Sequence, residues 1–207
     1  MSRLISALYD RVLGPSERAG LAVWRDELLS GLSGKVLEIG AGTGLNLPHY
    51  PETVTRLVMA EPDAHMRRRL EKRIASHPRR CGQISTIDAV AELLPFPTAT
   101  FDAVVSTLVL CSVEDPAAAA SEIHRVLAPG GRLVFIEHVG GETGRVARRQ
   151  RRLEPVWKRV AGNCHLTRDT SAVIEAAGFT LDVVESPLPR AVSWARPAIR
   201  GTALRPE

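Results

Sequence analysis

Short apolar runs alternate with amphipathic stretches along most of the chain. The runs at 103–105 and 133–136 contain no polar side chain, which is typical of strands buried on both faces of a parallel sheet. Residues 63–76 and 116–127 instead carry apolar side chains at helical spacing. The alternation predicts an α/β fold with a doubly wound, mostly parallel sheet of seven strands. We expect these strands at about residues 35–39, 56–61, 83–87, 101–107, 131–138, 179–185 and 200–205.

The N-terminal part of the chain has a helical pattern. Residues 2–32 predict one or two helices with a break at Gly14-Pro15-Ser16, because glycine and proline interrupt helices. Residues 1–33 would then form N-terminal cap helices, and 139–170 a longer insertion after the fifth strand. No internal repeat or low-complexity segment is visible, so we expect a single domain over residues 1–207.

Residues 36–44 read Val-Leu-Glu-Ile-Gly-Ala-Gly-Thr-Gly, a short strand followed by a glycine-rich turn. A dinucleotide fingerprint has the spacing G-x-G-x-x-G and places a pyrophosphate on the next helix. Here the third glycine comes one residue early, and Leu45 stands in its place. The acid Glu38 would repel a pyrophosphate and attract a cation. A nucleoside ligand with a positive charge and no phosphate fits both facts, and S-adenosylmethionine (SAM) is such a ligand.

A second acid follows the next predicted strand. Residues 56–61 are mostly apolar and end in Glu61, 23 residues after Glu38. In doubly wound nucleotide-binding folds, an acid at about this distance hydrogen-bonds to the ribose hydroxyls. We therefore expect Glu61 to bind the ribose, although a solvated residue at a strand end is the alternative.

Several motifs follow one another at a spacing that resembles the class I SAM-dependent methyltransferases, in the branch that contains the ubiquinone/menaquinone C-methyltransferases. They cover about residues 35–138 and are Val36–Gly44, Glu61-Pro62-Asp63, Leu94–Pro97, Phe101–Val105 and Glu122–Gly131. The resemblance implies a Rossmann-like methyltransferase fold. A narrower likeness to the methyltransferase-like thiol methyltransferases rests on Thr107–Val113, Glu137–Val139, Leu166–Arg168 and Arg196–Gly201.

The resemblance also implies which residues bind SAM. They are Glu38, Gly40, Ala41, Gly42, Thr43, Gly44 and Asn46 at the methionine end, Glu61 and Pro62 at the ribose, Ala91 and Glu92 at the adenine, and Leu108 and Cys111 near the sulfonium. Val90 stands where the family often has an aspartate, so the Ala91 backbone and the Glu92 carboxylate are the expected substitutes, with Asp88 as a fallback. Asn46 could instead cap the next helix, and Cys111 could be a small buried apolar residue.

The acceptor side offers two histidines. His138, at the end of the fifth strand, is the first candidate for an assisting base, and His165 is the second. A histidine that only fixes loops is the alternative. Glu137 should point to the opposite face of the strand from His138, because side chains alternate along a strand. A thiol acceptor ionises near neutrality, so alignment of the reactants could suffice without a base.

Charge and composition bring in rival functions. The net charge is +4, the sequence pI is about 9.3, and arginines recur through the insertion. Residues 146, 153, 157 and 160 are apolar at helical spacing, which predicts an amphipathic lid that Pro155 would kink. A basic face is suited to RNA or to an anionic membrane surface. We do not expect nucleic acid as the partner, because residues 106–109 lack an Asn/Asp-Pro-Pro-aromatic clamp and aromatic residues make up only 4% of the chain.

The remaining features concern the compartment. Three widely spaced cysteines predict a reducing cytoplasm and no metal site. No apolar run reaches the ~18 residues of a spanning helix, so we expect no counterpart to the membrane anchor of the animal relatives.

We therefore expect a SAM-dependent methyltransferase that acts on a small apolar acceptor and releases S-adenosylhomocysteine. A thiol is the favoured acceptor and a lipid or quinone-like ring the next. The N-terminal helices, with Tyr9, and the insertion would close over this acceptor. An RNA-modifying enzyme and a SAM-binding regulator without turnover are the alternatives. The oligomeric state stays open.

Overall fold

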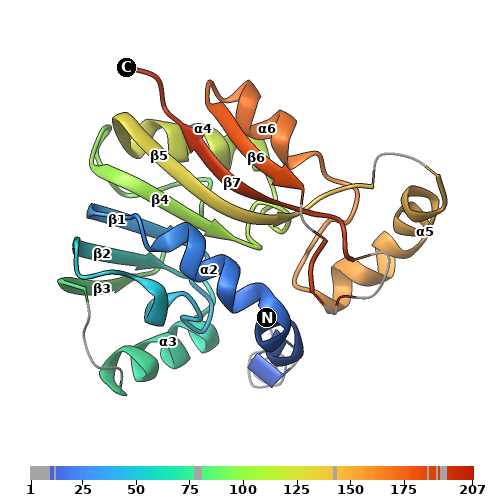
Figure 1. The fold of residues 1–207 in the computed structure, drawn as a ribbon, viewed down its shortest axis with the longest axis horizontal. Helices are drawn as coiled ribbons and strands as arrows, with labels where there is room; N and C mark the ends of the chain where they lie inside the picture. The colour runs from blue at the N-terminus through green and yellow to red at the C-terminus, as the bar shows by residue number, and fades with distance from the viewer. Residues whose placement is uncertain are drawn as a thin grey trace.

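The computed structural model describes residues 10–11, 13–76, 81–141, 144–185, 187–189, 191 and 195–207. Within this part of the chain, seven strands form one sheet in the order β3-β2-β1-β4-β5-β7-β6 (Figure 1). All neighbours pair in parallel except β7, which is antiparallel to both β5 and β6. The predicted α/β fold with a mostly parallel sheet is therefore confirmed. The strands are β1 (Gly34–Ile39), β2 (Val54–Ala60), β3 (Gln83–Ile87), β4 (Phe101–Thr107), β5 (Leu127–His138), β6 (Thr180–Glu185) and β7 (Ala198–Leu204).

Helices cover both faces of the sheet (Figure 1). Helices α4 and α6 pack on one face, where Val104 and Leu37 join their apolar side chains. Helices α2 and α3 pack on the other face, against Val36 and Val105. Alternate residues of one strand thus enter different cores, which explains the uninterrupted apolar runs of the central strands. The helices are η1 (Glu17–Leu21), α2 (Ala22–Leu29), η2 (Leu47–His49), α3 (Ala64–Ser76), α4 (Pro116–Val126), α5 (Gly144–Val160) and α6 (Thr170–Ala176).

The predicted helix break at Gly14-Pro15-Ser16 is wrong. These residues are helical, and the irregular point lies at Gly20, whose φ of 139° is readily adopted only by glycine. It falls within η1, a π-helical turn in which the N–H of Ala22 bonds to the carbonyl of Glu17. The helical segment is therefore distorted at Gly20, about one turn after the Gly-Pro pair at which the sequence predicts a break.

The predicted insertion at 139–170 contains α5, which stands beyond the ends of β5 and β7 (Figure 1). The helix continues through Pro155. Only Ala147 and Gln150 are buried in it, whereas Val146 and Val160 of the predicted apolar face are exposed. Gln150 ties the helix to the end of β5, because its side chain accepts from the Gly141 N–H and donates to the Val139 carbonyl. In the described part of the chain, no helix is both long and apolar enough to cross a membrane.

Candidate active site

The glycine turn after β1 forms one wall of a cleft at the carboxyl end of the sheet. Gly40 and Gly42 both have positive φ angles, of 54° and 57°. A Cβ on Gly40 would lie 2.6 Å from the Val109 side chain, so packing excludes a larger residue there. A Cβ on Gly42 would meet nothing nearer than the Gly40 carbonyl at 3.9 Å. The backbone of Gly42 therefore faces open space that a ligand can approach closely. The turn leads into the short 3₁₀ turn η2, where a dinucleotide-binding fold would begin an α-helix.

Glu38 is a buried acid at the floor of this cleft, with 3% of its surface exposed. Its carboxylate accepts hydrogen bonds from the Asn46 amide at 3.0 Å and from the Tyr50 hydroxyl at 2.8 Å. Burial raises the pKa of Glu38 to about 7, although these hydrogen bonds and the charge of Arg25 act against the shift. A cation in the cleft would favour the ionised form, so the acid suits a positively charged ligand.

Asn46 links this acid to the neighbouring elements and does not cap the following turn. Its amide nitrogen donates to Glu38 and also to the Thr107 hydroxyl at 3.1 Å. Its oxygen accepts from Arg25 at 2.5 Å, and Arg25 in turn forms an ion pair with Glu17 at 2.8 Å. Of the two roles expected for Asn46, helix capping is thus wrong. Asn46 instead connects α2 to the cleft, because it bonds to Arg25 of that helix.

Glu61, just after β2, joins the glycine turn to the loop that follows β2. One carboxylate oxygen accepts from the Gly42 N–H at 2.7 Å, and the other accepts from the Asp63 N–H at 2.8 Å. Burial raises the pKa of Glu61. Each oxygen has a further lone pair, so the carboxylate can still accept from a vicinal diol. Pro62, beside it, is exposed.

The residues expected at the adenine make protein contacts of their own. Ala91 is buried, whereas Glu92 accepts from the Glu114 N–H at 2.9 Å and from the Asp115 N–H at 3.4 Å. Asp88, the fallback, forms an ion pair with Arg67 at 2.9 Å. All three residues follow β3, at the same sheet edge as the glycine turn.

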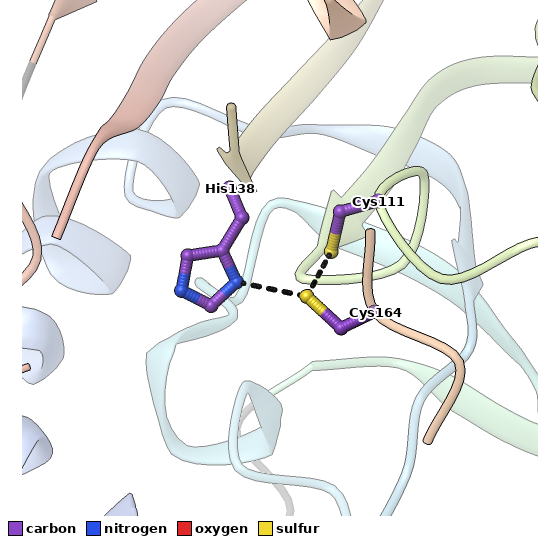
Figure 2. A group of neighbouring side chains, drawn as sticks. All are labelled: Cys111, His138 and Cys164. Carbon is purple, nitrogen blue, oxygen red and sulfur yellow. Dashed lines mark hydrogen bonds between the residues drawn. The ribbon is translucent and has the colours of Figure 1, made fainter. Parts of the chain in front are cut away.

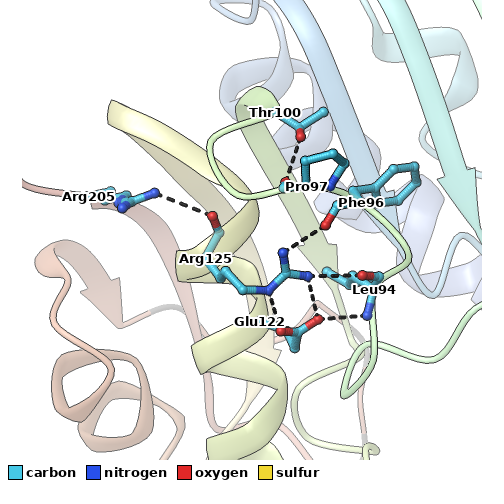
Figure 3. Close-up of polar contacts among 7 residues, drawn as sticks. All are labelled: Leu94, Phe96, Pro97, Thr100, Glu122, Arg125 and Arg205. Atoms are coloured by element: carbon cyan, nitrogen blue, oxygen red, sulfur yellow. Dashed lines mark hydrogen bonds and ion pairs between the residues drawn. The ribbon is translucent and has the colours of Figure 1, made fainter.

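The motif at 94–97 is held by α4 (Figure 3). Glu122 accepts from the Leu94 N–H at 2.8 Å, while Arg125 donates to the carbonyls of Leu94 and Phe96 at 2.9 and 2.7 Å. The two side chains also pair with each other at 2.6 Å. Arg125 lowers the pKa of Glu122 through this hydrogen bond. The two sequence motifs, at 94–97 and 122–131, are therefore joined in the structure by the side chains of Glu122 and Arg125.

Glu137 holds the loop after β4, which sequence reasoning missed. The carboxylate is fully buried and accepts from the Ser106 hydroxyl at 2.6 Å and from three successive backbone N–H groups, all at 3.1 Å. Those groups belong to residues 109–111. Arg168 holds the carbonyl side of the same loop, at Leu110 and Val113. The motifs of the narrower likeness thus meet in one place. Leu108, in the same loop, has a positive φ of 59°.

His138 meets two cysteines (Figure 2), whereas the neighbouring Glu137 carboxylate accepts from Ser106 and from the loop after β4. Its Nδ1 lies 3.3 Å from the Cys164 sulfur, which lies 3.7 Å from the Cys111 sulfur. The hydrogen bond with Cys164 raises the pKa of Cys111, and the bond with Cys111 lowers the pKa of Cys164. Burial lowers the pKa of His138, but contacts with Cys111 and Glu137 outweigh it, and the net shift is upward. Sequence reasoning did not place Cys164 in the site.

The other expected acceptor-side residues lie further out. The His165 ring faces Glu154 of α5 at 3.6 Å, and burial together with Arg168 and Lys158 lowers the pKa of His165. Leu108 packs against the apolar cluster that contains Leu21 of the N-terminal helices. Tyr9, expected to help cover the acceptor, lies outside the described residues.

Comparison with known proteins agrees with this geometry. A family model described as a methyltransferase domain matches residues 37–135. Human thiol S-methyltransferase TMT1B is 36% identical over 182 residues, which span 86% of this chain and 74% of the relative. Human TMT1A is 34% identical over 184 residues, spanning 85% and 73%. TMT1B of Rattus norvegicus is 38% identical over 155 residues, spanning 73% of this chain and 63% of the relative.

Solved structures show the same fold. A SAM-dependent methyltransferase from Thermotoga maritima has a TM-score of 0.71 at 21% identity, with 98% of this chain and 97% of that chain covered. A SAM-dependent methyltransferase from Mesorhizobium loti has a TM-score of 0.63 at 22% identity, with 90% and 98% covered. The glycine turn and the two buried acids suit a positively charged nucleoside such as SAM, and these relatives are methyltransferases. The chain belongs to the family of SAM-dependent methyltransferases that includes the thiol S-methyltransferases TMT1A and TMT1B.

Proposed function

We propose that this protein transfers the methyl group of SAM to the sulfur of a small apolar thiol. The observation that carries the proposal is the identity of 34–38% with relatives named as thiol S-methyltransferases. The convergence of the shared segments around the end of β5 supports it, since Glu137 and Arg168 fix the loop that begins the acceptor side.

The donor site would be built by residues on three strand ends. The open backbone face of Gly42 accommodates the donor, Glu38 supplies the negative charge below it, and Glu61 accepts from the ribose. The segment at 91–92 lies at the adenine side. When bound, SAM supplies a methyl group attached to a sulfonium. After transfer of the methyl group, the former sulfonium leaves as the neutral thioether of S-adenosylhomocysteine. Leu108 and the N-terminal helices would exclude water from the acceptor side, since Leu108 and Trp24 pack against the same apolar cluster, which contains Leu21.

Alignment, rather than a free base, would be the main contribution of the protein. His138 is a poor candidate for a base because its Nδ1 faces Cys164 and its ring also bonds to the Ala195 backbone. His165 lies toward Glu154 on α5. Holding two reactants in line can supply roughly 7–11 kcal/mol of the barrier.

A turnover assay tests the proposal. The release of S-adenosylhomocysteine is measured over matched thiols, phenols, quinols and lipids. We expect turnover with apolar thiols and at least about tenfold less with the phenol of the same shape, since a phenol is less ionised at neutral pH. Turnover only on quinols or lipids would overturn the thiol proposal, and tight donor binding with no turnover at all would favour a regulator.

Helix α5 favours a second candidate, a lipid acceptor reached at an anionic membrane surface. Val156 and Val160 are each 60% exposed, and arginines surround them on the helix. Exposed apolar side chains among basic ones are typical of helices that lie on membranes. Cosedimentation with phosphatidylglycerol vesicles, compared with phosphatidylcholine vesicles, tests this surface. Equal binding to both kinds of vesicle would refute an electrostatic attraction to anionic lipid. Tighter binding to RNA than to either vesicle would favour an RNA-modifying enzyme.

A further inference from the structure

Three metal-binding side chains converge beyond the ends of β4 and β5 (Figure 2). Cys111 comes from the loop after β4, His138 ends β5, and Cys164 follows α5. Their sulfur and nitrogen atoms all lie within 4.8 Å of one another. These residues are far apart in the sequence, so the fold alone brings them together.

The distances fit the edges of a tetrahedron around Zn²⁺. With Zn–S bonds of about 2.3 Å and Zn–N bonds of about 2.05 Å, tetrahedral angles place two sulfurs about 3.8 Å apart and a sulfur and a nitrogen about 3.6 Å apart. The Cys111 and Cys164 sulfurs are 3.7 Å apart, and Cys164 lies 3.3 Å from Nδ1 of His138. The remaining edge, between Cys111 and His138, is at most 4.8 Å, so about 1 Å of side-chain movement completes the set.

The surroundings orient these atoms. The His138 ring hydrogen-bonds to the Ala195 backbone, and because Nδ1 faces Cys164 this bond falls to Nε2. Donation by Nε2 keeps a lone pair on Nδ1 and fixes the ring, as is usual for metal-binding histidines. Glu137 holds the backbone N–H of Cys111 at 3.1 Å. The buried indole N–H of Trp157 makes no hydrogen bond of normal length but interacts with the Cys164 sulfur.

We propose that Cys111, His138 and Cys164 bind Zn²⁺, with the fourth position taken by the sulfur of the methyl acceptor. Two thiolates balance the charge of the ion, which a buried site requires. The group comprises three such residues in the described part of the chain, and three protein ligands with one open position characterise catalytic zinc sites. His138 is partly exposed, which gives the fourth ligand a direction of approach. The expectation of no metal site is replaced by this proposal.

The role of the fourth position rests on the proposed thiol acceptor. An acceptor thiol releases its proton to solvent as its sulfur binds the ion. The sulfur then forms the new bond to the methyl carbon while the bond from that carbon to the sulfonium breaks, and the electron pair stays on S-adenosylhomocysteine. The thioether product is neutral and binds zinc more weakly than a thiolate, so it can leave.

Metal content of the tag-free protein tests the site without any turnover. We expect about one Zn²⁺ per chain by mass spectrometry of metals, removal by a chelator, and a thiolate-to-metal absorption band when Co²⁺ is added back. Cys111→Ser, Cys164→Ser and His138→Ala should each lower the zinc content at least tenfold. Cys81→Ser is the matched control, because Cys81 is a buried cysteine in the core beneath α2 and α3, outside the group of three, and its replacement should retain full zinc.

Far-ultraviolet circular dichroism and thermal unfolding, measured on every variant, show whether the fold survives. Addition of a small apolar thiol to the Co²⁺ protein should shift its visible bands, and the phenol of the same shape should not. Absence of zinc and of the cobalt spectrum in protein that binds S-adenosylhomocysteine would overturn the site, as would a Cys111–Cys164 disulfide in freshly purified protein. Bound metal without a thiol-dependent shift of the cobalt bands would overturn the claim that the acceptor sulfur takes the fourth position. A thiol-dependent shift with turnover only on other acceptors would refute the proposed function and leave the site standing.

Discussion

Replacement of Glu137 should destabilise the protein in a graded way that depends on how many hydrogen bonds the new side chain keeps. Three of the four donors contact Oε1, and only the Cys111 N–H contacts Oε2. Hydrogen bonds to a charged group contribute about 1.5–3 kcal/mol each, though not additively. Glu137→Ala leaves four buried donors without an acceptor, so we expect a loss of about 4 kcal/mol in the free energy of unfolding. That is a large part of the ~5–15 kcal/mol typical of a domain.

Glu137→Gln should cost only about 1–2 kcal/mol, because its carbonyl oxygen can take the place of Oε1 while its NH₂ group opposes the Cys111 N–H. The measurement is urea unfolding under reducing conditions. Asp102→Asn is the control, since that exposed carboxylate accepts a single backbone hydrogen bond within the described part of the chain, from the Lys35 N–H at 2.7 Å, and its replacement should cost less than about 1 kcal/mol. Equal losses for the alanine and glutamine variants, or a loss below about 1 kcal/mol for alanine, would refute the assigned role of the carboxylate.

Four further predictions concern the donor cleft and α5. Gly42→Val should abolish S-adenosylhomocysteine binding, measured by calorimetry, because the valine side chain fills the cleft. Gly130→Val is the control, since Gly130 has a similar positive φ of 71° in open space, and it should leave the binding intact. Loss of binding in both variants would mean that backbone strain, and not the filled cleft, is the cause. Glu61→Ala should weaken the same binding by roughly 1.5–3 kcal/mol, and an unchanged affinity would remove Glu61 from the site. Because the folded-state pKa of Glu38 is about 7, above its ordinary 4.5, the folded protein holds this proton more tightly than the unfolded chain. The free energy of unfolding without donor should therefore fall by up to about 3 kcal/mol as pH rises from about 4.5 to about 7, and a Glu38→Gln variant with the same slope would contradict this. Glutamine at four exposed α5 positions should leave donor affinity and thiol turnover nearly unchanged, since exposed charges contribute little; a parallel loss of turnover and RNA binding would favour the RNA reading. These positions are Arg148, Arg149, Arg151 and Arg152.

Features that depend on local sequence were predictable. The bounds of β3 and β4 match the expected 83–87 and 101–107, because short apolar runs bounded by polar turns leave little freedom of assignment. The glycine turn and the acid at the end of β1 also form the cleft that their spacing indicates. The predicted break at Gly14-Pro15 failed because it rested on local propensity alone. In the structure residues 14–16 are helical and the irregularity lies at Gly20, beside Leu21, which belongs to the apolar cluster with Ile136 and Leu188.

Contacts between distant segments were not predictable. Alternation along β5 gives the opposite directions of Glu137 and His138, but it does not identify what each side chain meets. The four donors to Glu137 lie 26–31 residues earlier, and Cys164 lies 53 residues after Cys111. Sequence spacing within one element contains no information on such distances. The segments at 107–113 and 166–168 both belong to the narrower family likeness, but nothing in their sequence indicates that Arg168 contacts the carbonyls of Leu110 and Val113.

The loop after β4 couples the two halves of the reaction. The strand residue just before it, Thr107, accepts from Asn46 on the donor side, and Cys111 within the loop lies on the acceptor side. Glu137 fixes three N–H groups at 109–111 and Arg168 fixes the carbonyls of Leu110 and Val113, so a shift of the loop would break several of these bonds. An in-line methyl transfer depends on the distance and angle between donor and acceptor more than on proton transfer. A rigid connection of this kind is therefore where we expect substitutions to lower kcat without a matching change in donor affinity.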